Sequence, residues 1–465
     1  MSTAIRPNPS AGGSKPDGRP PRGDAHAEAP TTLTERVPRT LGLLDQFGFW
    51  GNLGVSLLGF SGAIALLAPY GVTPLTFGAA VVATVVGSAL GGLILGATLV
   101  LGPKTGAPAM VILRGVLGAR ASIVPTVLNI AQCLGWAVFE LVVISTGLRA
   151  LTHDHVPRWL CLVVAGAVTT GLTIWPLGWI RSLRKYVSVL VVAALVVLAF
   201  GLLRNPVPHL AGSWQGFWLA VDAAVALTIS WVPLGADYSR HSRSARSAFA
   251  GGFLGYGVTQ IACLVVGLVA LAQVAQDGNR IFDLFIGLPL GTIAFAVLVI
   301  RETDQSFANV YSTAMSIQNL RPNVDRRILT VAIGILITVL ALTINIDDYA
   351  NFLYLIGAVF VPMSGVLVAV WWRSRGESLD LSESAPTRPA MLGAWLIGFT
   401  VYQLINPGSL AHWSNFWTTV STHLHTAGHT WLSASVTSFA VALLLALPFA
   451  RVARRPSQGR QPDRR

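Results

Sequence analysis

Charged residues are scarce in this sequence of 465 residues. Asp, Glu, Lys and Arg make up only 11% of it, and 53% of the residues are hydrophobic. About 25% charged residues is usual in a soluble domain. The mean hydropathy is +0.62. This composition excludes an ordinary soluble enzyme and predicts an integral membrane protein, with the lipid bilayer as its surroundings.

The few charges are unbalanced, with a formal net charge of +12. In a soluble protein such an excess of basic residues would point to nucleic acid. Here the basic residues lie in the two ends of the chain and in alternate loops, so membrane topology explains them. No nucleic-acid partner is predicted, and no obligate protein partner is inferred.

Cysteine is also scarce, with Cys133, Cys161 and Cys263 all in apolar stretches, which excludes a disulfide framework. A nucleophile elbow, an HExxH motif and a GxGxxG fingerprint are missing, so neither an enzyme nor a cofactor is predicted. Histidines gather in residues 408–430 without a nearby Cys or acid, and this segment is interpreted as a polar loop rather than a metal site. They are His412, His423, His425 and His429.

The two ends of the sequence differ in composition from its centre. Residues 1–38 are polar, rich in Pro, Gly and Ala, and lack an apolar core. They predict a disordered cytoplasmic tail rather than a cleavable signal peptide. Residues 451–465 predict a basic cytoplasmic tail, and residues 40–450 a transmembrane domain.

Long apolar stretches recur along the central region. A hydrocarbon core of about 30 Å requires about 20 apolar residues in a helix. Twelve stretches qualify as spans, which predicts an all-α polytopic membrane protein. They lie near residues 46–69, 75–101, 123–151, 157–178, 186–204, 216–236, 248–276, 287–317, 328–346, 350–372, 391–407 and 431–450.

Arginine and lysine predict the orientation of these spans. They are concentrated in the even-numbered connections, whereas the odd-numbered ones hold only Arg149, Arg158, Arg204 and Arg280. Because positive charge stays on the cytoplasmic side, both termini are predicted to lie in the cytoplasm. The expected location is the plasma (cytoplasmic) membrane.

Spans one and six carry helix-breaking residues at matching positions if the first ten spans form two repeats of five. The stretch FGFWGNLGVSLLGFSG holds Gly48, Gly51 and Asn52, and TISWVPLGADYSR holds Pro233 and Gly235. Paired interruptions of this kind point to a transporter binding site, because unwound backbone offers carbonyl groups to a cation and helix ends to a substrate. Glycine-rich helix packing is the alternative.

Polar and aromatic residues in spans three and six suit a planar, nitrogen-rich ring. Trp136 and Glu140 are four residues apart and share a helix face. A Trp offers a stacking surface, and a carboxylate accepts hydrogen bonds from N–H groups. Trp231 in span six is a candidate for the other ring face, with Thr228 nearby; structural packing is the alternative for these residues.

Span eight, IRETDQSFANVYSTAM, carries polar residues at membrane depth, where they are costly. Arg301 and Glu302 are interpreted as a neutralising pair. Asp304 is the candidate to bind a cation or a proton. Asn309 both donates and accepts, which suits the amide-like edge of a ring.

Four stretches together resemble the purine/cytosine permease family, the nucleobase–cation symporters of the first kind. They are GPKTGAPAMVILRGVLGAR, GWAVFE, GADYSRH and DQSFANVYSTAMSIQNL. The resemblance covers nearly all of residues 40–450. It implies the LeuT-like fold of two inverted five-helix repeats plus two extra helices, which makes twelve transmembrane helices.

The resemblance also implies roles for single residues. Trp136 is similar to the ring-stacking tryptophan, Asn309 to the substrate-holding asparagine, and Trp231 rather than Thr228 to the second aromatic. Glu140 stands where many members have glutamine, so an edge rich in N–H donors is expected. Asn52 and Thr228 complete the substrate-binding candidates.

For the coupling ion, the resemblance implies sites on spans one and eight. Thr303 and Asp304 occupy the positions of a Ser/Thr pair, and helix-one carbonyls are expected around Gly48 to Gly51. Because an aspartate replaces a hydroxyl residue in that pair, the coupling ion is expected to be either sodium or a proton.

The expected function is secondary active transport, by alternating access, of a nucleobase (cytosine or a purine) with a coupled monovalent cation. Hydantoin, allantoin, uracil or a thiamine-precursor pyrimidine are alternative substrates. A membrane enzyme, a sensor or a channel is disfavoured because the sequence has no catalytic or signalling domain and no filter-like motif.

Overall fold

The structure is a computed structural model that describes residues 29–31, 33, 37–69, 72–182, 186–344, 349–374, 379–408, 410–426 and 431–450. The tail predicted at 451–465 lies outside the described residues, as does most of the tail predicted at 1–38. Within the described ranges the chain is helical, and β-pairing is limited to the isolated bridges Leu41–Ser242 and Leu75–Ser213.

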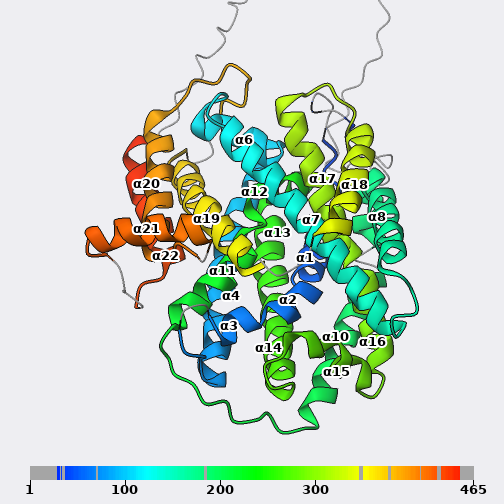
Figure 1. Cartoon of the computed structure of the whole chain (residues 1–465). Helices are drawn as coiled ribbons and strands as arrows, with labels where there is room; N and C mark the ends of the chain where they lie inside the picture. The colour runs from blue at the N-terminus through cyan, green and yellow to red at the C-terminus, as the bar shows by residue number, and fades with distance from the viewer. Residues whose placement is uncertain are drawn as a thin grey trace, which may run out of the picture.

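The helices are numbered in chain order (Figure 1). Their bounds are α1 Leu43–Leu53, α2 Leu57–Gly62, α3 Ile64–Leu67, α4 Phe77–Leu99, α5 Leu101–Thr105, α6 Ala109–Leu117, α7 Ile123–Leu151, α8 Arg158–Ile174, α9 Pro176–Ser182, α10 Ser188–Leu203, α11 Phe217–Ile229, α12 Val232–Ser239, α13 Ala245–Ala250, α14 Gly257–Gln273, α15 Ile281–Gly287, α16 Gly291–Arg301, α17 Thr303–Leu320, α18 Arg326–Thr343, α19 Tyr349–Ser374, α20 Pro389–Ile405, α21 Ala411–His423 and α22 Ala434–Ala446. A π-helical turn, Gly251–Tyr256, joins α13 to α14.

Every predicted span coincides with one helix or with consecutive helices. In the part of the chain that the structure describes, six helices are long and apolar enough to cross a membrane, or seven if the bent pair α1 and α2–α3 is one span. Shorter apolar helices are Arg158–Ile174, Ser188–Leu203, Pro389–Ile405 and Ala434–Phe449. The prediction of an all-α membrane protein is confirmed.

Several connections between the predicted spans contain helices, among them α6, α15 and α21. Residues 102–118, which connect the second and third predicted spans, form the end of α5 and the whole of α6. The segment 408–430 was predicted to be a polar loop, and this is wrong for its first half, which forms α21. That helix is stabilised by aromatic side chains: Trp413 and Trp417 lie with ring centroids 5.9 Å apart, and both contact Phe399 of α20.

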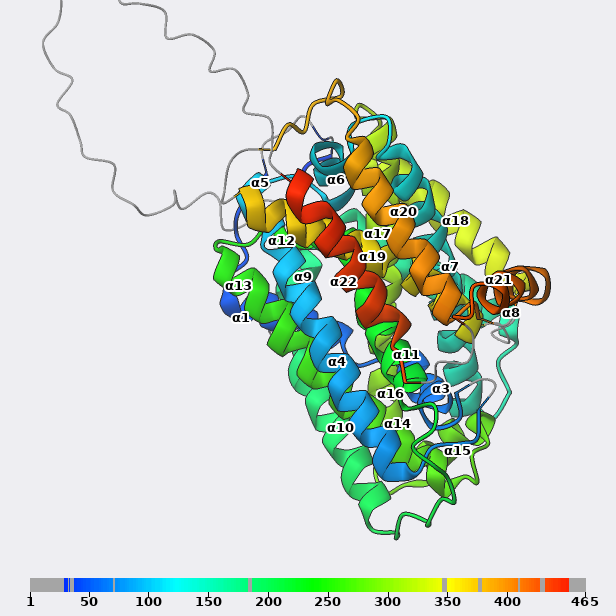
Figure 2. The same ribbon diagram turned by 90° about the vertical axis from the view of Figure 1, so that its left-hand side faces the viewer.

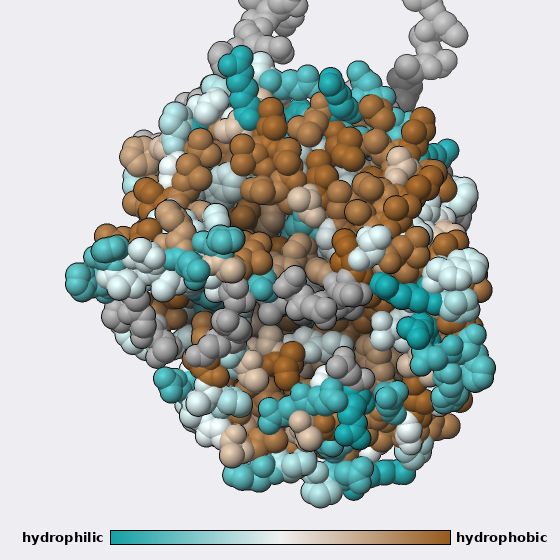
Figure 3. Space-filling view, in the orientation of Figure 1, coloured by the Kyte–Doolittle hydropathy of each residue, from teal (hydrophilic) through white to brown (hydrophobic). Residues whose placement is uncertain are grey.

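The long helices pack in pairs around a common centre. Helix α7 packs along α17, α4 along α11, and α19 along α22; Figure 2 shows α4 and α22 running along one side of the bundle. Large apolar side chains on the outside of α10 and α18 are exposed, such as Phe200 and Ile335. Figure 3 shows apolar residues over much of the upper half of this face, with hydrophilic residues along the top edge, at the lower end and at the left and right sides. This surface suits a lipid environment.

Three of the spans are interrupted near the middle of the bundle. The first bends by 49° between α1 and α2. There Ser56 caps α2 by accepting from Leu58 N, and Gly54 packs against the next layer. A Cβ atom on Gly54 would lie 2.1 Å from Thr259 Oγ1, so only glycine permits this approach. The sixth span is interrupted at Ser230 and Trp231, and the eighth at Glu302.

Asp222 of α11 holds the start of α22 in place. It accepts hydrogen bonds from Ser433 Oγ (2.5 Å), Ala434 N (2.8 Å) and Ser435 N (3.0 Å). Asp222 is therefore a helix-capping residue, which satisfies backbone N–H groups that a helix start leaves unpaired.

We expect Asp222→Ala to destabilise the protein by about 3 kcal/mol, because three buried donors lose a charged acceptor. Substrate affinity should stay within about twofold of wild type, since the cap lies outside the cavity described below. Thermal unfolding in detergent and ligand binding on the same sample measure both effects. An unchanged melting temperature would contradict the capping role.

Candidate functional site

A small cavity lies at the centre of the bundle, between the α1–α2 break, α7, the α11–α12 break, α14 and α17. Its wall is largely apolar, with a few polar groups pointing inward, which is the usual character of a small-molecule site. The lining residues are Leu53, Gly54, Ser56, Leu58, Gly59, Trp136, Glu140, Leu227, Ser230, Trp231, Leu234, Tyr256, Gln260, Cys263, Leu264, Gln305 and Asn309.

Two tryptophans contribute aromatic surface to this cavity. Trp136 of α7 is held edge-on by Phe352, with ring centroids 5.3 Å apart. Trp231 lies at the α11–α12 break and donates from Nε1 to the Tyr256 hydroxyl at 3.0 Å. Trp50 contacts Trp231 edge-on at 6.1 Å. Each indole is therefore fixed from behind by another aromatic side chain.

Two polar side chains of the cavity are suited to hydrogen bonding with a ligand. Glu140 is fully buried, and neither carboxylate oxygen accepts a hydrogen bond from the described residues. Asn309 of α17 donates from Nδ2 to the Gln305 carbonyl at 3.1 Å, which leaves part of its amide for other partners. Glu140 lies beside the Glu302 carboxyl group as well as the cavity, so a proton shared between the two acids or a donor on a ligand satisfies its oxygens.

The structure thus brings Trp136, Glu140, Trp231 and Asn309 together around one cavity. Thr228 and Asn52 are absent from its lining. Thr228 Oγ1 donates to Gln260 Oε1 at 3.1 Å, behind the wall. The Asn52 side chain donates to Asp304. The substrate-binding roles of all six residues remain predictions.

Sequence reasoning missed the contribution of span seven. Gln260 lines the cavity and is held by Ser88 Oγ (2.8 Å) and by Thr228. Tyr256 lines it from the π-helical turn. A glutamine inside the apolar run GVTQIACLVV is itself a signal, because polar groups in membrane spans usually face the interior of the bundle.

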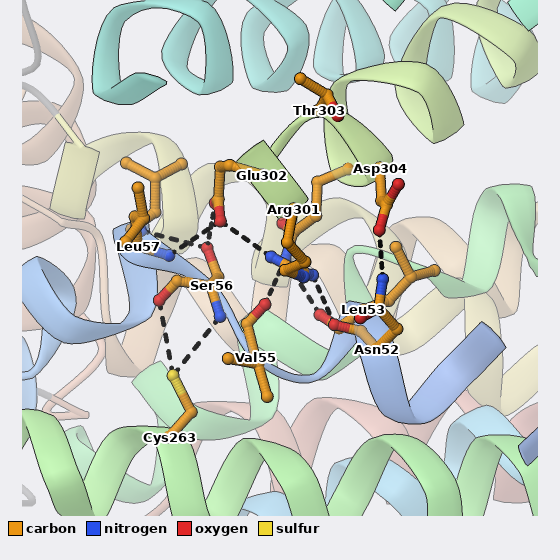
Figure 4. Close-up of polar contacts among 12 residues, drawn as sticks. Asn52, Leu53, Val55, Ser56, Leu57, Cys263, Arg301, Glu302, Thr303 and Asp304 are labelled. Carbon is orange, nitrogen blue, oxygen red and sulfur yellow. Dashed lines mark hydrogen bonds and ion pairs between the residues drawn. The ribbon is translucent and has the colours of Figure 1, made fainter. Parts of the chain in front are cut away.

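A polar cluster lies beside the cavity, where α17 meets the α1–α2 break (Figure 4). The predicted Arg301–Glu302 pair is present, with Nη1 and Oε2 2.8 Å apart and both side chains buried. Arg301 Nη2 also donates to the Asn52 carbonyl. Glu302 accepts from Ser56 Oγ (2.8 Å) and from Leu57 N (3.0 Å).

Asp304 is buried on the other side of Asn52. It accepts hydrogen bonds from the Asn52 side chain and from Trp179 Nε1, the latter at 2.8 Å. Trp179, from α9, was not identified from the sequence. These two donors stabilise the carboxylate without a bound ion, so the role of Asp304 in binding a cation or proton remains a prediction.

The other predicted ion ligands are Thr303, Gly48 and Gly51. Thr303 Oγ1 donates to the Ile300 carbonyl at 2.7 Å, and Figure 4 shows its side chain pointing away from the cluster. Gly48 and Gly51 lie inside α1, because the helix continues to Leu53. The break therefore falls later than the prediction placed it, at Gly54 to Ser56. Ion binding by these three residues is untested.

Comparison with known proteins gives a match over residues 35–389 to the family described as permease for cytosine/purines, uracil, thiamine, allantoin. The putative purine-cytosine permease YxlA of Bacillus subtilis is 23% identical over 314 residues, which are 62% of this chain and 67% of that protein. The vitamin B6 transporter TPN1 of Saccharomyces cerevisiae is 23% identical over 350 residues, 68% of this chain and 59% of that protein. The matches thus span about three fifths to two thirds of these relatives.

Solved structures share the fold. Mhp1, a nucleobase-cation-symport-1 family transporter in a closed conformation with bromovinylhydantoin bound, superposes with a TM-score of 0.70 at 17% identity, covering 90% of this chain and 94% of that one. A sodium-coupled sialic acid symporter gives a TM-score of 0.57 at 12% identity, covering 91% and 94%. The fold is that of LeuT-like transporters, as predicted from the interrupted spans and the resemblance.

Proposed function

The chain belongs to the family of permeases for cytosine/purines, uracil, thiamine and allantoin, and on that premise we propose that it imports a nucleobase, cytosine or a purine, together with a coupled cation. It is a transporter and not an enzyme. Transport is secondary active and uses alternating access, in which one part of the bundle rocks against the other around the central cavity.

The observation that carries this proposal is the chemistry of the cavity wall. Trp136 and Trp231 supply flat aromatic surface for a planar ring. Glu140 offers buried carboxyl oxygens to the cavity, beside the Glu302 carboxyl group. Asn309 offers an amide. A planar heterocycle with an exocyclic amino group and a ring N–H matches this set, because its N–H donors pair with Glu140.

A second substrate class is kept because of two of the relatives. One structural relative is described with bromovinylhydantoin bound, and one sequence relative is a vitamin B6 transporter. Hydantoin, allantoin, uracil or a thiamine-precursor pyrimidine are therefore the alternative substrates. Keto groups dominate several of these rings, and they fit a carboxylate less well because both partners are acceptors.

The membrane, the orientation of the chain and the coupling ion complete the proposed function. Transport takes place across the plasma (cytoplasmic) membrane with both chain termini on the cytoplasmic side, on the evidence of the basic even-numbered connections. The ligand is a small molecule, the coupling ion is sodium or a proton, and the function requires no nucleic acid and no obligate protein partner.

Uptake of labelled cytosine into proteoliposomes that hold the purified protein tests the proposal. A sodium gradient and a proton gradient are imposed separately, and unlabelled adenine, guanine, uracil, hydantoin and allantoin compete. We expect concentrative uptake under one gradient, with amino-bearing bases the strongest competitors. Protein-free liposomes are the control. Absence of uptake under both gradients, together with no binding of any competitor, would overturn the proposal.

A further inference from the structure

Side chains from other segments donate to backbone carbonyl groups on both sides of the α1–α2 break, although the carbonyls of Asn52 and Ser56 also accept from Val55 N and Phe60 N. The Asn52 carbonyl accepts from Arg301 Nη2. Gln305 Nε2 donates to the carbonyls of Leu53 (3.0 Å) and Val55 (3.2 Å). The Ser56 carbonyl accepts from Cys263 Sγ at 3.4 Å. Four carbonyl oxygens that border the break, those of Asn52, Leu53, Val55 and Ser56, thus each have a side-chain donor.

The donor at Asn52 is itself a cation. The Arg301 side chain is almost completely buried, and an arginine in a membrane protein keeps its charge. Its guanidinium bridges the carbonyl at the end of α1 and the carboxylate of Glu302, which in turn accepts from Leu57 N at the start of α2. A positive charge therefore stands at the carboxyl end of α1, where the helix dipole favours it.

Buried carboxylates near Arg301 also favour a positive charge at this place. Three buried carboxylates, those of Glu140, Glu302 and Asp304, lie around Arg301, which acts electrostatically on Glu140 and Asp304 and pairs directly with Glu302. Buried charge is stable only when it is paired and hydrogen-bonded. Removal of the guanidinium would leave these carboxylates with no arginine or lysine partner among the described interactions of the cluster.

We propose that Arg301 is a tethered cation that fills the α1–α2 break, so that no sodium ion binds there and transport is independent of sodium. This inference rests on the proposed function for its transport consequence, but not for the ion site itself. Arg301 is the last residue of α16. The positive charge at the break therefore comes from a side chain that belongs to neither α1 nor α2. The charge of Arg301 balances that of Glu302 at the break without an ion from solution.

The proton then remains as the coupling ion. The groups that can carry it are the carboxylates of Glu140, Glu302 and Asp304. The other titratable groups that act on this cluster are the Tyr256 hydroxyl and the Cys263 thiol, both from the helix that packs against the break.

Sodium binding to the purified protein tests the proposal without knowledge of the substrate. Melting temperatures are compared in sodium and in choline, and binding of radioactive sodium is measured directly. We expect no difference in melting temperature and no saturable sodium binding for the wild type. A saturable rise with sodium, accompanied by stoichiometric sodium binding that Asp304→Asn removes, would overturn the proposal.

Variants at position 301 sharpen the test. Arg301→Gln removes the charge but keeps polar groups, and we expect this variant to acquire a saturable stabilisation by sodium. Arg301→Lys keeps the charge and should stay insensitive to sodium. Arg240→Gln is the matched control: Arg240 is equally buried but donates to Tyr311 at 3.2 Å, away from the break. It should lower the melting temperature equally in sodium and in choline.

Failure of this proposal differs from failure of the proposed function. If no nucleobase is transported but the wild type binds no sodium and Arg301→Gln does, the substrate class is wrong and the tethered cation stands. If cytosine is taken up only under a sodium gradient, the tethered cation is wrong and the transporter stands. If Arg301→Gln does not fold, absence of sodium binding to the wild type and to Arg301→Lys still supports the proposal, and its presence overturns it.

Discussion

Asn309→Ala is expected to abolish measurable substrate binding while the protein stays folded. Asn309 lines the cavity from α17 and uses one N–H on the Gln305 carbonyl, so its amide oxygen and second N–H are the groups that meet a ring edge. Leaving two ligand groups unpaired costs at least about 2 kcal/mol, which weakens binding roughly 30-fold or more.

The measurement is the affinity for cytosine and for the best competitor from the uptake experiment. Ser312→Ala is the matched control on the same helix, because Ser312 is buried but donates to Tyr238 at 3.2 Å, outside the cavity. It should bind within about twofold of wild type. Wild-type affinity in Asn309→Ala would remove Asn309 from the site. An equal loss in both variants would show that the effect comes from distortion of α17.

The positions of the spans were predictable because hydropathy and helix length are local properties. The third span, predicted at 123–151, is α7, Ile123–Leu151. The clustering of Trp136 and Glu140 followed from their spacing of four residues on one helix. Their meeting with Asn309 follows from the packing of α7 along α17, which the family resemblance supplied and periodicity alone does not.

The position of the first break was less predictable. Gly48, Gly51 and Gly54 are chemically equivalent in the sequence, yet only Gly54 ends the helix. The difference lies in its contacts: Gly54 packs against Tyr256 and Thr259, about 200 residues further along the chain. A glycine's role in a helix therefore depends on which partner approaches it, and local composition does not contain that information.

The partners of the polar cluster were not predictable for the same reason. The sequence placed Arg301, Glu302 and Asp304 together, and the Arg301–Glu302 pair followed. It gave no sign that Trp179 donates to Asp304, or that Gln305 reaches the carbonyls of Leu53 and Val55. By contrast, α21 could have been recognised, because Trp413 and Trp417 are spaced by four and share one helix face.

Glu140→Gln is expected to change the order of substrate preference. Glutamine keeps the size of glutamate but replaces one acceptor oxygen with a donor NH₂. An exocyclic amino group that donates to the replaced oxygen then meets a donor of its own kind, at a cost of about 1–3 kcal/mol. The ratio of affinities for amino-bearing bases over keto-bearing rings should fall by about 10-fold or more. Competition against labelled substrate, with cytosine and adenine compared to uracil and hydantoin, measures this ratio.

A change in the ratio of affinities distinguishes a direct contact between Glu140 and the ring from a general electrostatic effect of its charge. Glu140 interacts electrostatically with Glu302 and Arg301, so loss of its charge also changes the local electrostatic potential. That change affects all neutral ligands alike and leaves the ratio of their affinities the same. Asp222→Asn is the matched carboxylate-to-amide control, since Asp222 is buried at the α22 cap and absent from the cavity wall. It should leave the ratio unchanged. If Glu140→Gln weakened all ligands equally, Glu140 would act through the charge cluster and would not touch the ring, and the preference for N–H-rich bases would lose its physical basis.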